Sequence, residues 1–335
     1  MEPLRIVAIG GGTGLSSVLH GLKRYAKEPR EVEITAIVTV TDDGGSSGRL
    51  RREFDVLPPG DIRNCMVALS EDDALLSRLF QYRFSEGRGL KGHSFGNLFL
   101  TALTNLTGDF VGAVKLSSEV LASLGRIYPS TDADVVLEAE LENGRIVKGE
   151  TRIGKSVSRI RQLRLRPRIC MPLPETLAAI EEADLITFGP GSLFTSVIPN
   201  VLVKGIPRAI RRSRALKAYF VNLMSQPGET TGFRASDHVA AIHRHAGVSF
   251  LDVAVVNTRP ISPRQRRKYA AEEARPVVND VDRLAEIGLQ IVATDLLADG
   301  TTVRHDPRAT AEVAVELARR GHAARRRVPI LARAE

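Results

Sequence analysis

Two glycine-rich runs in this chain carry residue types that suit phosphate binding. The first, Gly10–Gly14, follows the apolar run Leu4–Ile9 and precedes apolar residues at helical spacing from Leu15 to Leu22. Backbone N–H groups at such a helix start converge on an anion, and glycine permits close approach and positive φ. The residues expected to bind this anion are Gly11, Gly12, Thr13 and Gly14. An ordinary tight turn between a strand and a helix is the alternative.

The first run is not a dinucleotide-binding fingerprint. Leu15 stands where the third glycine of G-x-G-x-x-G belongs, and no P-loop lysine follows at the required spacing. The spacing therefore disfavours both a nicotinamide-dependent oxidoreductase and a P-loop nucleotide hydrolase.

The second run, Thr41–Gly48, follows the apolar run Ile34–Val40 and begins with a pair of acids, Asp42 and Asp43. A Rossmann protein places a ribose-binding acid at about this point. Paired carboxylates beside phosphates also suit a hard cation such as Mg²⁺. We expect Asp42 and Asp43 to hold a sugar hydroxyl or Mg²⁺ next to a flexible glycine–serine loop. A solvated Asp-Gly turn would explain the same residues.

A polar turn precedes the apolar helical run Cys65–Leu69. Asp61 is placed to cap that helix, and a capping role and a functional role are both open. Arg63 and Asn64 add a guanidinium fork that matches phosphate and an amide in the same turn. We therefore include Asp61 and Asn64 among the candidate site residues.

The segment Gly92–Asn97 opens a further helix with polar side chains. A helix start that bears His, Ser and Asn can receive an anion or orient a leaving group. His93 is a candidate general acid and Asn97 a candidate ligand contact. A lone histidine is more often a structural hydrogen-bonding residue, which is the alternative for His93.

Three later segments of the chain add further candidate site residues. Gly189–Ser192 follows the apolar run Leu185–Phe188 as a second anion-binding loop, with Gly189, Gly191 and Ser192 as its contacts. Asn222 ends another apolar run, and Arg304 can reach a diphosphate. Nearby Asp306 is explained as a helix N-cap. Metal binding by the histidines of a predicted surface helix is disfavoured, and these are His238, His243 and His245.

Composition indicates a globular protein. The chain has 335 residues, 43% of them hydrophobic, and no apolar stretch approaches the length needed to span a bilayer. Its two cysteines give no disulfide framework, so a reduced, cytoplasmic protein is expected. The net charge is +8, but the basic clusters lack interleaved aromatics, which argues against nucleic-acid binding. These clusters are Arg211–Arg214, Arg264–Lys268 and Arg325–Arg327.

Short apolar runs alternate with helical patterns along the chain, which predicts an α/β, Rossmann-like fold with a largely parallel sheet and helices on both faces. The predicted strands are Leu4–Ile9, Ile34–Val40, Leu185–Phe188, Ala218–Leu223, Val253–Asn257 and Leu289–Ala293. We expect one nucleotide-binding domain over residues 1–325 and a basic C-terminal tail over residues 326–335. A small β-rich insertion, a hairpin with a primed turn, is expected at about 134–169. This insertion could form a dimer contact, cover the site as a cap, or be a surface element without a role in binding.

With these motifs in order along nearly the whole chain, the sequence closely resembles the gluconeogenesis factor family of the CofD-like superfamily. The resemblance implies a Rossmann-like fold, a cytosolic protein and binding of a UDP-sugar such as UDP-N-acetylglucosamine. It also implies a role in cell shape and wall synthesis during gluconeogenic growth. The related transferase branch moves a phospholactyl group from a nucleotide diphosphate and uses magnesium. Relatives often carry threonine after the His-Asp pair, where this chain has Pro307.

Two functions follow from these residues. In the first, the protein is a nucleotide-sugar sensor without catalytic activity, with the diphosphate over the two glycine loops and beside Arg304; it signals to a protein partner and can form homo-oligomers. In the second, it is a Mg²⁺-dependent transferase that relies on positioning and charge neutralisation. The catalytic residues would then be Asp43, Asp61, His93 and Asn97, with Asp42 and Asp43 on the metal.

Overall fold

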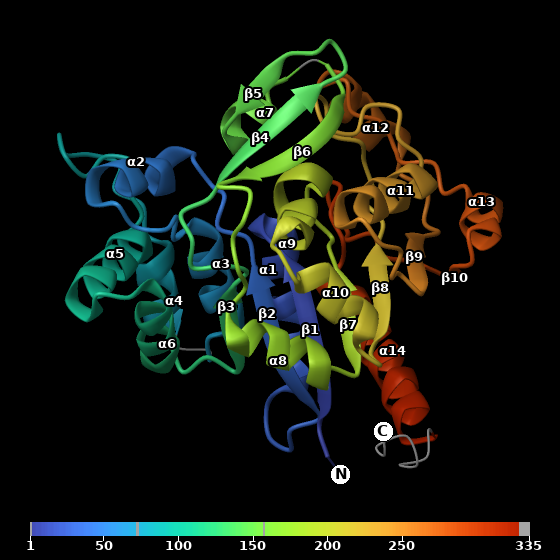
Figure 1. Cartoon of the computed structure of the whole chain (residues 1–335), viewed down its shortest axis with the longest axis horizontal. Coiled ribbons are helices and arrows are strands. Elements are labelled where there is room, and N and C mark those ends of the chain that lie inside the picture. Colours follow the sequence, from blue (N-terminus) through green and yellow to red (C-terminus); the bar gives the residue numbers. More distant parts are fainter. Residues whose placement is uncertain (1, 72–73, 157, 328–335) are drawn as a thin grey trace.

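The computed structural model describes residues 2–71, 74–156 and 158–327. Its main sheet is parallel throughout, with the strand order β10-β9-β8-β7-β1-β2-β3 (Figure 1). Its strands are β1 (Leu4–Gly10), β2 (Val32–Val38), β3 (Gly125–Pro129), β7 (Leu185–Phe188), β8 (Leu216–Phe220), β9 (Val253–Asn257) and β10 (Gln290–Thr294). The α/β fold predicted from the sequence is confirmed.

Helices cover both faces of this sheet (Figure 1). The α-helices are α1 (Gly12–Leu22), α2 (Gly45–Phe54), α3 (Gly60–Leu69), α4 (Ala74–Gln81), α5 (Phe95–Thr107), α6 (Phe110–Val120), α7 (Glu150–Ile153), α8 (Pro174–Glu182), α9 (Ile198–Leu202), α10 (Ile206–Arg212), α11 (Ala235–Ala246), α12 (Pro263–Ala270), α13 (Val281–Glu286) and α14 (Pro307–Arg327). A 3₁₀ turn, η1 (Lys23–Tyr25), follows α1, and a π-helical turn, η2 (Leu193–Val197), precedes α9.

The alternating side chains of β1 serve two hydrophobic clusters. Ile6 and Ala8 pack with α1, α3 and α14, whereas Val7 and Ile9 pack with η2, α9 and α10 on the opposite face. Because successive side chains of a strand point to opposite faces, a strand with helices on both sides must be apolar throughout. This explains why β1 reads as an uninterrupted apolar run.

The strand order reverses between β1 and β7, which lie side by side with Ile9 opposite Phe188. The chain leaves β1 toward α1 on one face and leaves β7 toward η2 on the other face. Loops that diverge in this way open a crevice at the carboxyl ends of the two strands, where ligands of open α/β sheets bind. Both predicted anion loops, Gly10–Gly14 and Gly189–Ser192, begin at this point.

Two predicted strands, β2 and β8, differ from the observed ones by more than one residue, and one observed strand was not predicted. β2 begins and ends two residues before the predicted run Ile34–Val40, and β8 ends at Phe220 rather than Leu223. The edge strand β3 was not predicted, because its five residues include Gly125 and Pro129 and show no apolar alternation.

The insertion is β-rich, as predicted: β4 (Val136–Leu141), β5 (Ile146–Lys148) and β6 (Ile160–Arg166) form an antiparallel sheet. The prediction of a primed turn in its hairpin was wrong. Only Gly144 has positive φ (80°), and it donates to the carbonyl of Leu141 while the Leu141 amide donates to Arg145. This is a three-residue loop with the left-handed position at glycine. The apolar side chains of the insertion join the main core.

The expectation that α11 is a surface helix was wrong for its histidines. His238 is fully buried and its Nδ1 lies 2.8 Å from the Tyr219 hydroxyl. His245 is buried as well: its Nε2 accepts from the Leu163 amide at 3.0 Å, and its Nδ1 donates to the Ala241 carbonyl. Burial lowers the pKa of both imidazoles to about 4. They therefore connect α11 to β8 and to the insertion as neutral groups.

Helix α14 runs further than the sequence pattern indicated. It continues through Arg326 and Arg327, so the basic tail expected from residue 326 begins inside this helix. Arg325, of the last basic cluster, donates from Nη1 to the Ala183 carbonyl at 3.1 Å and so holds the end of this helix against the main domain. The rest of the tail, residues 328–335, lies outside the described residues. In the described part of the chain, no helix is both long enough and apolar enough to cross a bilayer.

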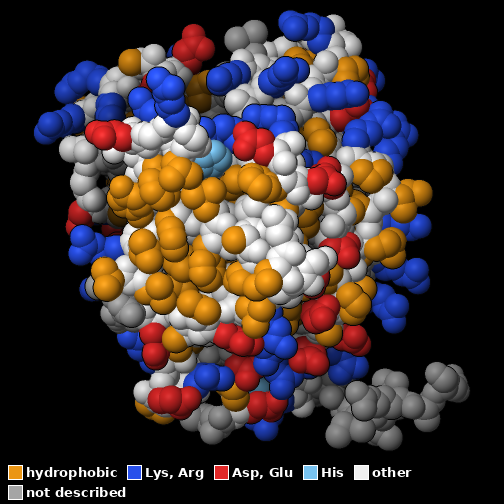
Figure 2. Space-filling model, turned by 90° about the vertical axis from the view of Figure 1, so that its left-hand side faces the viewer, with side chains coloured by type: hydrophobic (Ala, Val, Ile, Leu, Met, Phe, Trp, Pro, Cys, Tyr) orange, Lys and Arg blue, Asp and Glu red, His pale blue; other side chains and the backbone are white. Residues whose placement is uncertain are grey.

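One side of the molecule is unusually apolar. Eight of the fourteen exposed large hydrophobic side chains among the described residues lie between residues 54 and 120, in and around α4, α5 and α6. Figure 2 shows hydrophobic side chains gathered in the middle of this side, with basic side chains dominating above them and acidic side chains frequent below. Leu75 and Leu106 are the most exposed, at 74% and 81%. An apolar area of this kind marks an interaction surface.

Candidate functional site

The loop after β1 forms the floor of the candidate site. Gly11 is extended, and Gly12 begins α1 with φ of 61°, a conformation that glycine adopts without strain. The N–H groups of Thr13 and Gly14 lie in the first turn of α1, where a helix offers no acceptor of its own. This helix start can therefore direct N–H groups and the positive end of its dipole at an anion.

Glycine at position 14 is required by the neighbouring loop. A Cβ at Gly14 would lie 2.2 Å from the Pro190 carbonyl oxygen and 2.9 Å from the Gly191 Cα. No side chain fits at that distance. The two glycine loops are thus in direct contact, and the packing between them fixes the floor of the crevice.

The polar groups after β7 are already hydrogen-bonded to side chains of the segment that contains Gln226 and Glu229. The carboxyl of Glu229 accepts from the Phe194 amide at 3.2 Å and from the Thr195 hydroxyl at 3.4 Å, at the start of η2. The Ser192 hydroxyl accepts from the Gln226 side chain at 2.6 Å. Burial raises the pKa of Glu229 to about 7, against the lowering effect of its two donors. An anion is therefore better placed at the start of α1 than at the start of η2.

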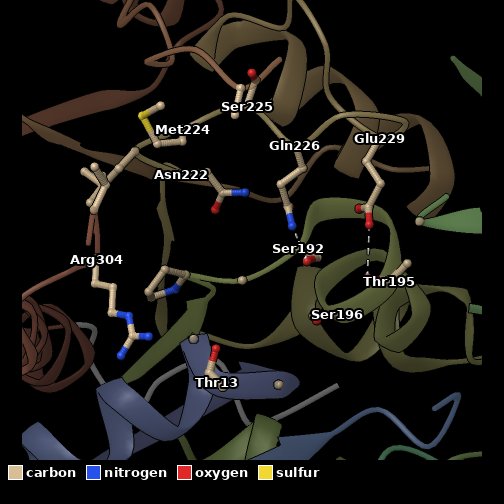
Figure 3. Close-up of a pocket in the computed structure, with 18 of the residues that line it drawn as sticks. Thr13, Ser192, Thr195, Ser196, Asn222, Met224, Ser225, Gln226, Glu229 and Arg304 are labelled. Atoms are coloured by element: carbon tan, nitrogen blue, oxygen red, sulfur yellow. Dashed lines mark hydrogen bonds between the residues drawn. The ribbon is translucent and has the colours of Figure 1, made fainter. Parts of the chain in front are cut away.

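The remaining wall comes from two segments distant in the sequence. Asn222 follows β8, and Arg304 precedes α14. Figure 3 shows Asn222, Arg304 and Thr13 facing one space from three separate segments. This space is a cavity of about 760 Å³ that both glycine loops also line. Arg304 is exposed, so its guanidinium has solvent on one side and the cavity on the other.

The structure brings together most of the predicted anion-binding residues. Those that line the cavity are Gly11, Gly12, Thr13, Gly14, Gly191, Ser192, Asn222 and Arg304. Gly189 belongs to the same loop but does not line the cavity. The other predicted residues lie outside it, namely Asp42, Asp43, Asp61, Asn64, His93 and Asn97.

The acidic pair is divided between two tasks. Asp42 Oδ1 accepts from the Gly44 amide at 2.9 Å, in a local turn. Asp43 Oδ1 accepts from both the amide and the hydroxyl of Thr151, at 2.8 and 2.6 Å, and so fastens the insertion to the main domain. The expectation of a flexible glycine–serine loop beside them was wrong, because residues 45–54 form α2.

The two aspartates do not fit a shared magnesium site. Asp43 already serves Thr151, and among the described residues no group of three or more His, Cys, Asp or Glu side chains is arranged to hold a metal. A hard cation needs several oxygen ligands around one point. We derive no chemical step from such an ion.

Asp61 is not the N-cap of α3. Pro59 occupies that position, and Asp61 lies in the first turn, where its carboxylate is hydrogen-bonded by the Gly12 amide. Burial raises the pKa of Asp61 to about 6, and the charge of Asp42 adds to the rise. Asp61 therefore supports the first glycine loop from beneath rather than facing the cavity.

His93 and Asn97 connect α2 to α5. The Ser46 hydroxyl lies 3.1 Å from His93 Nδ1, and Asn97 Nδ2 donates to the Ser47 hydroxyl at 3.4 Å. Both His93 and Asn97 are buried, and burial lowers the pKa of His93. The general-acid role has no support here, because neither residue lines the cavity.

The phosphate-matching fork of Arg63 has partners inside the protein. Its Nη1 donates to the Ser94 hydroxyl at 2.6 Å, and its Nη2 donates to Asn64 Oδ1 at 2.5 Å. Arg63 and Asn64 line a separate cavity of about 640 Å³ that shares Thr13 and Ser17 with the first one. The pair therefore lies on the other side of α1 from the diphosphate position.

The sequence did not single out Glu150, which lines the cavity from the insertion. Its Oε2 accepts from the Thr41 hydroxyl at 3.2 Å. Burial, followed by the negative charges of Asp61 and Asp42, raises its pKa to about 9. At neutral pH Glu150 is thus a carboxylic acid that can donate a hydrogen bond. No sequence signal could have found it, since it follows a weakly patterned hairpin.

The chain matches the family model described as 2-phospho-L-lactate transferase CofD over residues 6–297. The gluconeogenesis factor of Bacillus subtilis is 48% identical over 314 residues, which cover 93% of this chain and 98% of that protein. That of Halalkalibacterium halodurans is 47% identical over 317 residues, covering 94% and 97%. The chain belongs to the gluconeogenesis factors of the CofD family.

A solved structure has the same fold as this chain. A UPF0052-family protein from Bacillus halodurans has a TM-score of 0.90 to this chain and is 46% identical to it. The match covers 94% of this chain and all of that one. The overall fold of this chain is thus shared with that protein.

Proposed function

We propose that this gluconeogenesis factor binds a nucleotide diphosphate sugar of the UDP-N-acetylglucosamine type in the 760 Å³ cavity. The observation that carries the proposal is the convergence of Thr13, Asn222 and Arg304 on one space at the strand-order reversal. The start of α1 would bind the diphosphate and Arg304 would neutralise it from the opposite wall. Neutral Glu150 would donate to a sugar hydroxyl.

The bound sugar would serve as a signal. On this proposal the protein works in the cytoplasm, and ligand occupancy favours one conformation that a protein partner recognises. The outcome would be control of cell shape, wall synthesis and gluconeogenic growth. In support, the cavity walls come from different segments, including the insertion, so a bound ligand would contact several parts of the chain at once.

Calorimetry with UDP-N-acetylglucosamine tests this function. Arg304→Ala should weaken binding by about tenfold or more, since a charge-assisted pair is removed. Arg308→Ala is the matched control, because Arg308 is exposed four residues away and does not line this cavity. Absent binding by the wild type, or equal losses in the two variants, would overturn the assignment.

The alternative is a transferase that moves a phospholactyl-type group from a nucleotide diphosphate with the help of Mg²⁺. The match to the family described as 2-phospho-L-lactate transferase CofD favours it. Its test is Mg²⁺-dependent release of nucleoside monophosphate from candidate donors. Asp42→Asn is a sharper variant than Asp43→Asn, because Asp43 also holds Thr151 of the insertion. No release with any donor would count against catalysis.

We also propose that a second copy of this chain covers the apolar side formed by α4, α5 and α6. Figure 2 shows more basic side chains above this area and acidic ones below it. A two-fold axis can lie in this surface, at right angles to the direction from the basic to the acidic side chains. Rotation about that axis would bring unlike charges of the two copies together. Sedimentation velocity of Leu106→Glu, compared with Ile146→Glu in the insertion, tests this. A wild type that stays monomeric at high concentration would refute the dimer.

A further inference from the structure

A third cavity, of about 640 Å³, lies beside β6, α9, α10 and α11, whose places in the fold Figure 1 shows. It is enclosed by the chain after β6, the connection between α9 and α10, and the end of α11. The residues that line it are Arg168, Val201, Leu202, Val203, Lys204, Gly205, Pro207, Arg208, Arg211, His245, Ala246, Gly247 and Val248. It shares no lining residue with the cavity that contains Arg304.

The charge around this cavity is of one sign. Its lining contains Arg168, Lys204, Arg208 and Arg211 but no Asp or Glu. Lys204, Arg208 and Arg211 lie close together in the sequence, and the fold brings Arg168 of the insertion to them. Like charges held together repel one another unless an anion offsets them.

The neighbouring arginines show the contrast. On β6, Arg161, Arg164 and Arg166 all pair with glutamates of β4, such as Arg166 with Glu138 at 2.7 Å. Two residues further, Arg168 has no ion pair within the described residues, and the same holds for Lys204, Arg208 and Arg211. The arginines of β6 are thus neutralised by β4, whereas the four cations at the cavity have no carboxylate partner among the described residues.

We propose that this cavity binds the phosphate group of a phosphorylated small molecule or of a lipid headgroup. Arg168, Arg208 and Arg211 can present guanidinium forks that match phosphate oxygens, and Lys204 adds a point charge. The valines at positions 201, 203 and 248 provide an apolar wall for the rest of such a ligand. Phosphate in free and lipid-bound form would use the same contacts.

This site is connected to the nucleotide cavity through one continuous segment. Thr195 and Ser196 of η2 line the nucleotide cavity, and α9 ends at the residues that line the phosphate cavity. The two ligands would therefore contact opposite ends of the same buried segment, Leu193–Leu202.

Titration of the full-length protein with inorganic pyrophosphate tests the proposal. The double variant Arg208→Gln/Arg211→Gln should weaken one class of binding site by about tenfold or more. The control is Arg212→Gln/Arg214→Gln, which removes the same charge from exposed neighbours that do not line the cavity. It should change the affinity by about twofold or less, since a charge that does not contact the ligand acts on it only through screening solvent and salt.

Vesicles distinguish the two sources of phosphate. Binding to phosphatidylglycerol vesicles but not to phosphatidylcholine vesicles, lost in the cavity variant, would identify a lipid headgroup. Binding of pyrophosphate alone would identify a soluble ligand. Equal effects of the cavity variant and its control, or no binding of either probe, would overturn the proposal. Because all four substituted arginines are exposed, thermal melting should show each variant folded.

Discussion

His305 Nε2 lies 3.1 Å from the carbonyl oxygen of Val221 and donates a hydrogen bond to it. Each partner is next in sequence to a polar residue of the cavity wall. Asn222 comes directly after Val221, and Arg304 comes directly before His305. Burial lowers the pKa of His305 to about 4, so the imidazole is neutral at physiological pH. This one bond joins the segment before α14 to the end of β8.

His305→Ala should therefore misplace Arg304 without removing it. We expect affinity for UDP-N-acetylglucosamine to fall about fivefold, the equivalent of one neutral hydrogen bond at about 1 kcal/mol. The control is His20→Ala, since His20 is exposed and outside this cavity. Calorimetry of both variants checks this, and unchanged affinity in His305→Ala would contradict it.

Glu150 should make the folded protein less stable as pH rises. The pKa of Glu150 in the folded protein, about 9, is above its ordinary value of 4.5, so the folded state holds the proton more tightly. The stability from this group is full below pH 4.5 and is lost on going up to about pH 9, at about 1.4 kcal/mol per pH unit. Glu150→Gln should flatten thermal unfolding profiles over this range. Parallel profiles for wild type and variant would refute the assignment.

Gly14→Ala should destabilise the protein by about 2 kcal/mol or more, because the added Cβ would collide with the Pro190 carbonyl. Gly89→Ala is the control, since a Cβ there meets nothing within 4 Å and its φ is not positive. It should stay within about 0.5 kcal/mol of wild type. Urea denaturation measures both, and equal stabilities would show that the two glycine loops do not pack as described.

His245→Phe should cost about 1–3 kcal/mol, because it leaves the buried Leu163 amide without its acceptor. Amide hydrogen exchange in β6 should become faster, since this contact ties the insertion to α11. His20→Phe, an exposed substitution of the same kind, should leave exchange in β6 unchanged. If both variants exchange alike, His245 does not anchor the insertion.

The sequence alone predicted the α/β class and the two glycine loops that follow strands of the parallel sheet; the structure showed that both loops lie where the strand order reverses. Continuous apolar runs followed by glycine are local signals, and parallel strands necessarily present their carboxyl ends at one edge. Gly10–Gly14 and Gly189–Ser192 could therefore be assigned to the same edge of the sheet from the sequence. Arg304 was found because its neighbour Asp306 explained the helix cap and left the arginine without a structural reason.

Only the tertiary structure decided which polar residues face the cavity. Asp43, His93 and Asn97 follow the same local patterns as true cavity residues, but their side chains reach Thr151, Ser46 and Ser47 instead. Glu150 reaches the cavity from a hairpin with no motif of its own. The direction of each of these side chains depends on a hydrogen-bond partner in a segment about fifty to a hundred residues away. Local sequence spacing does not predict such a long-range contact.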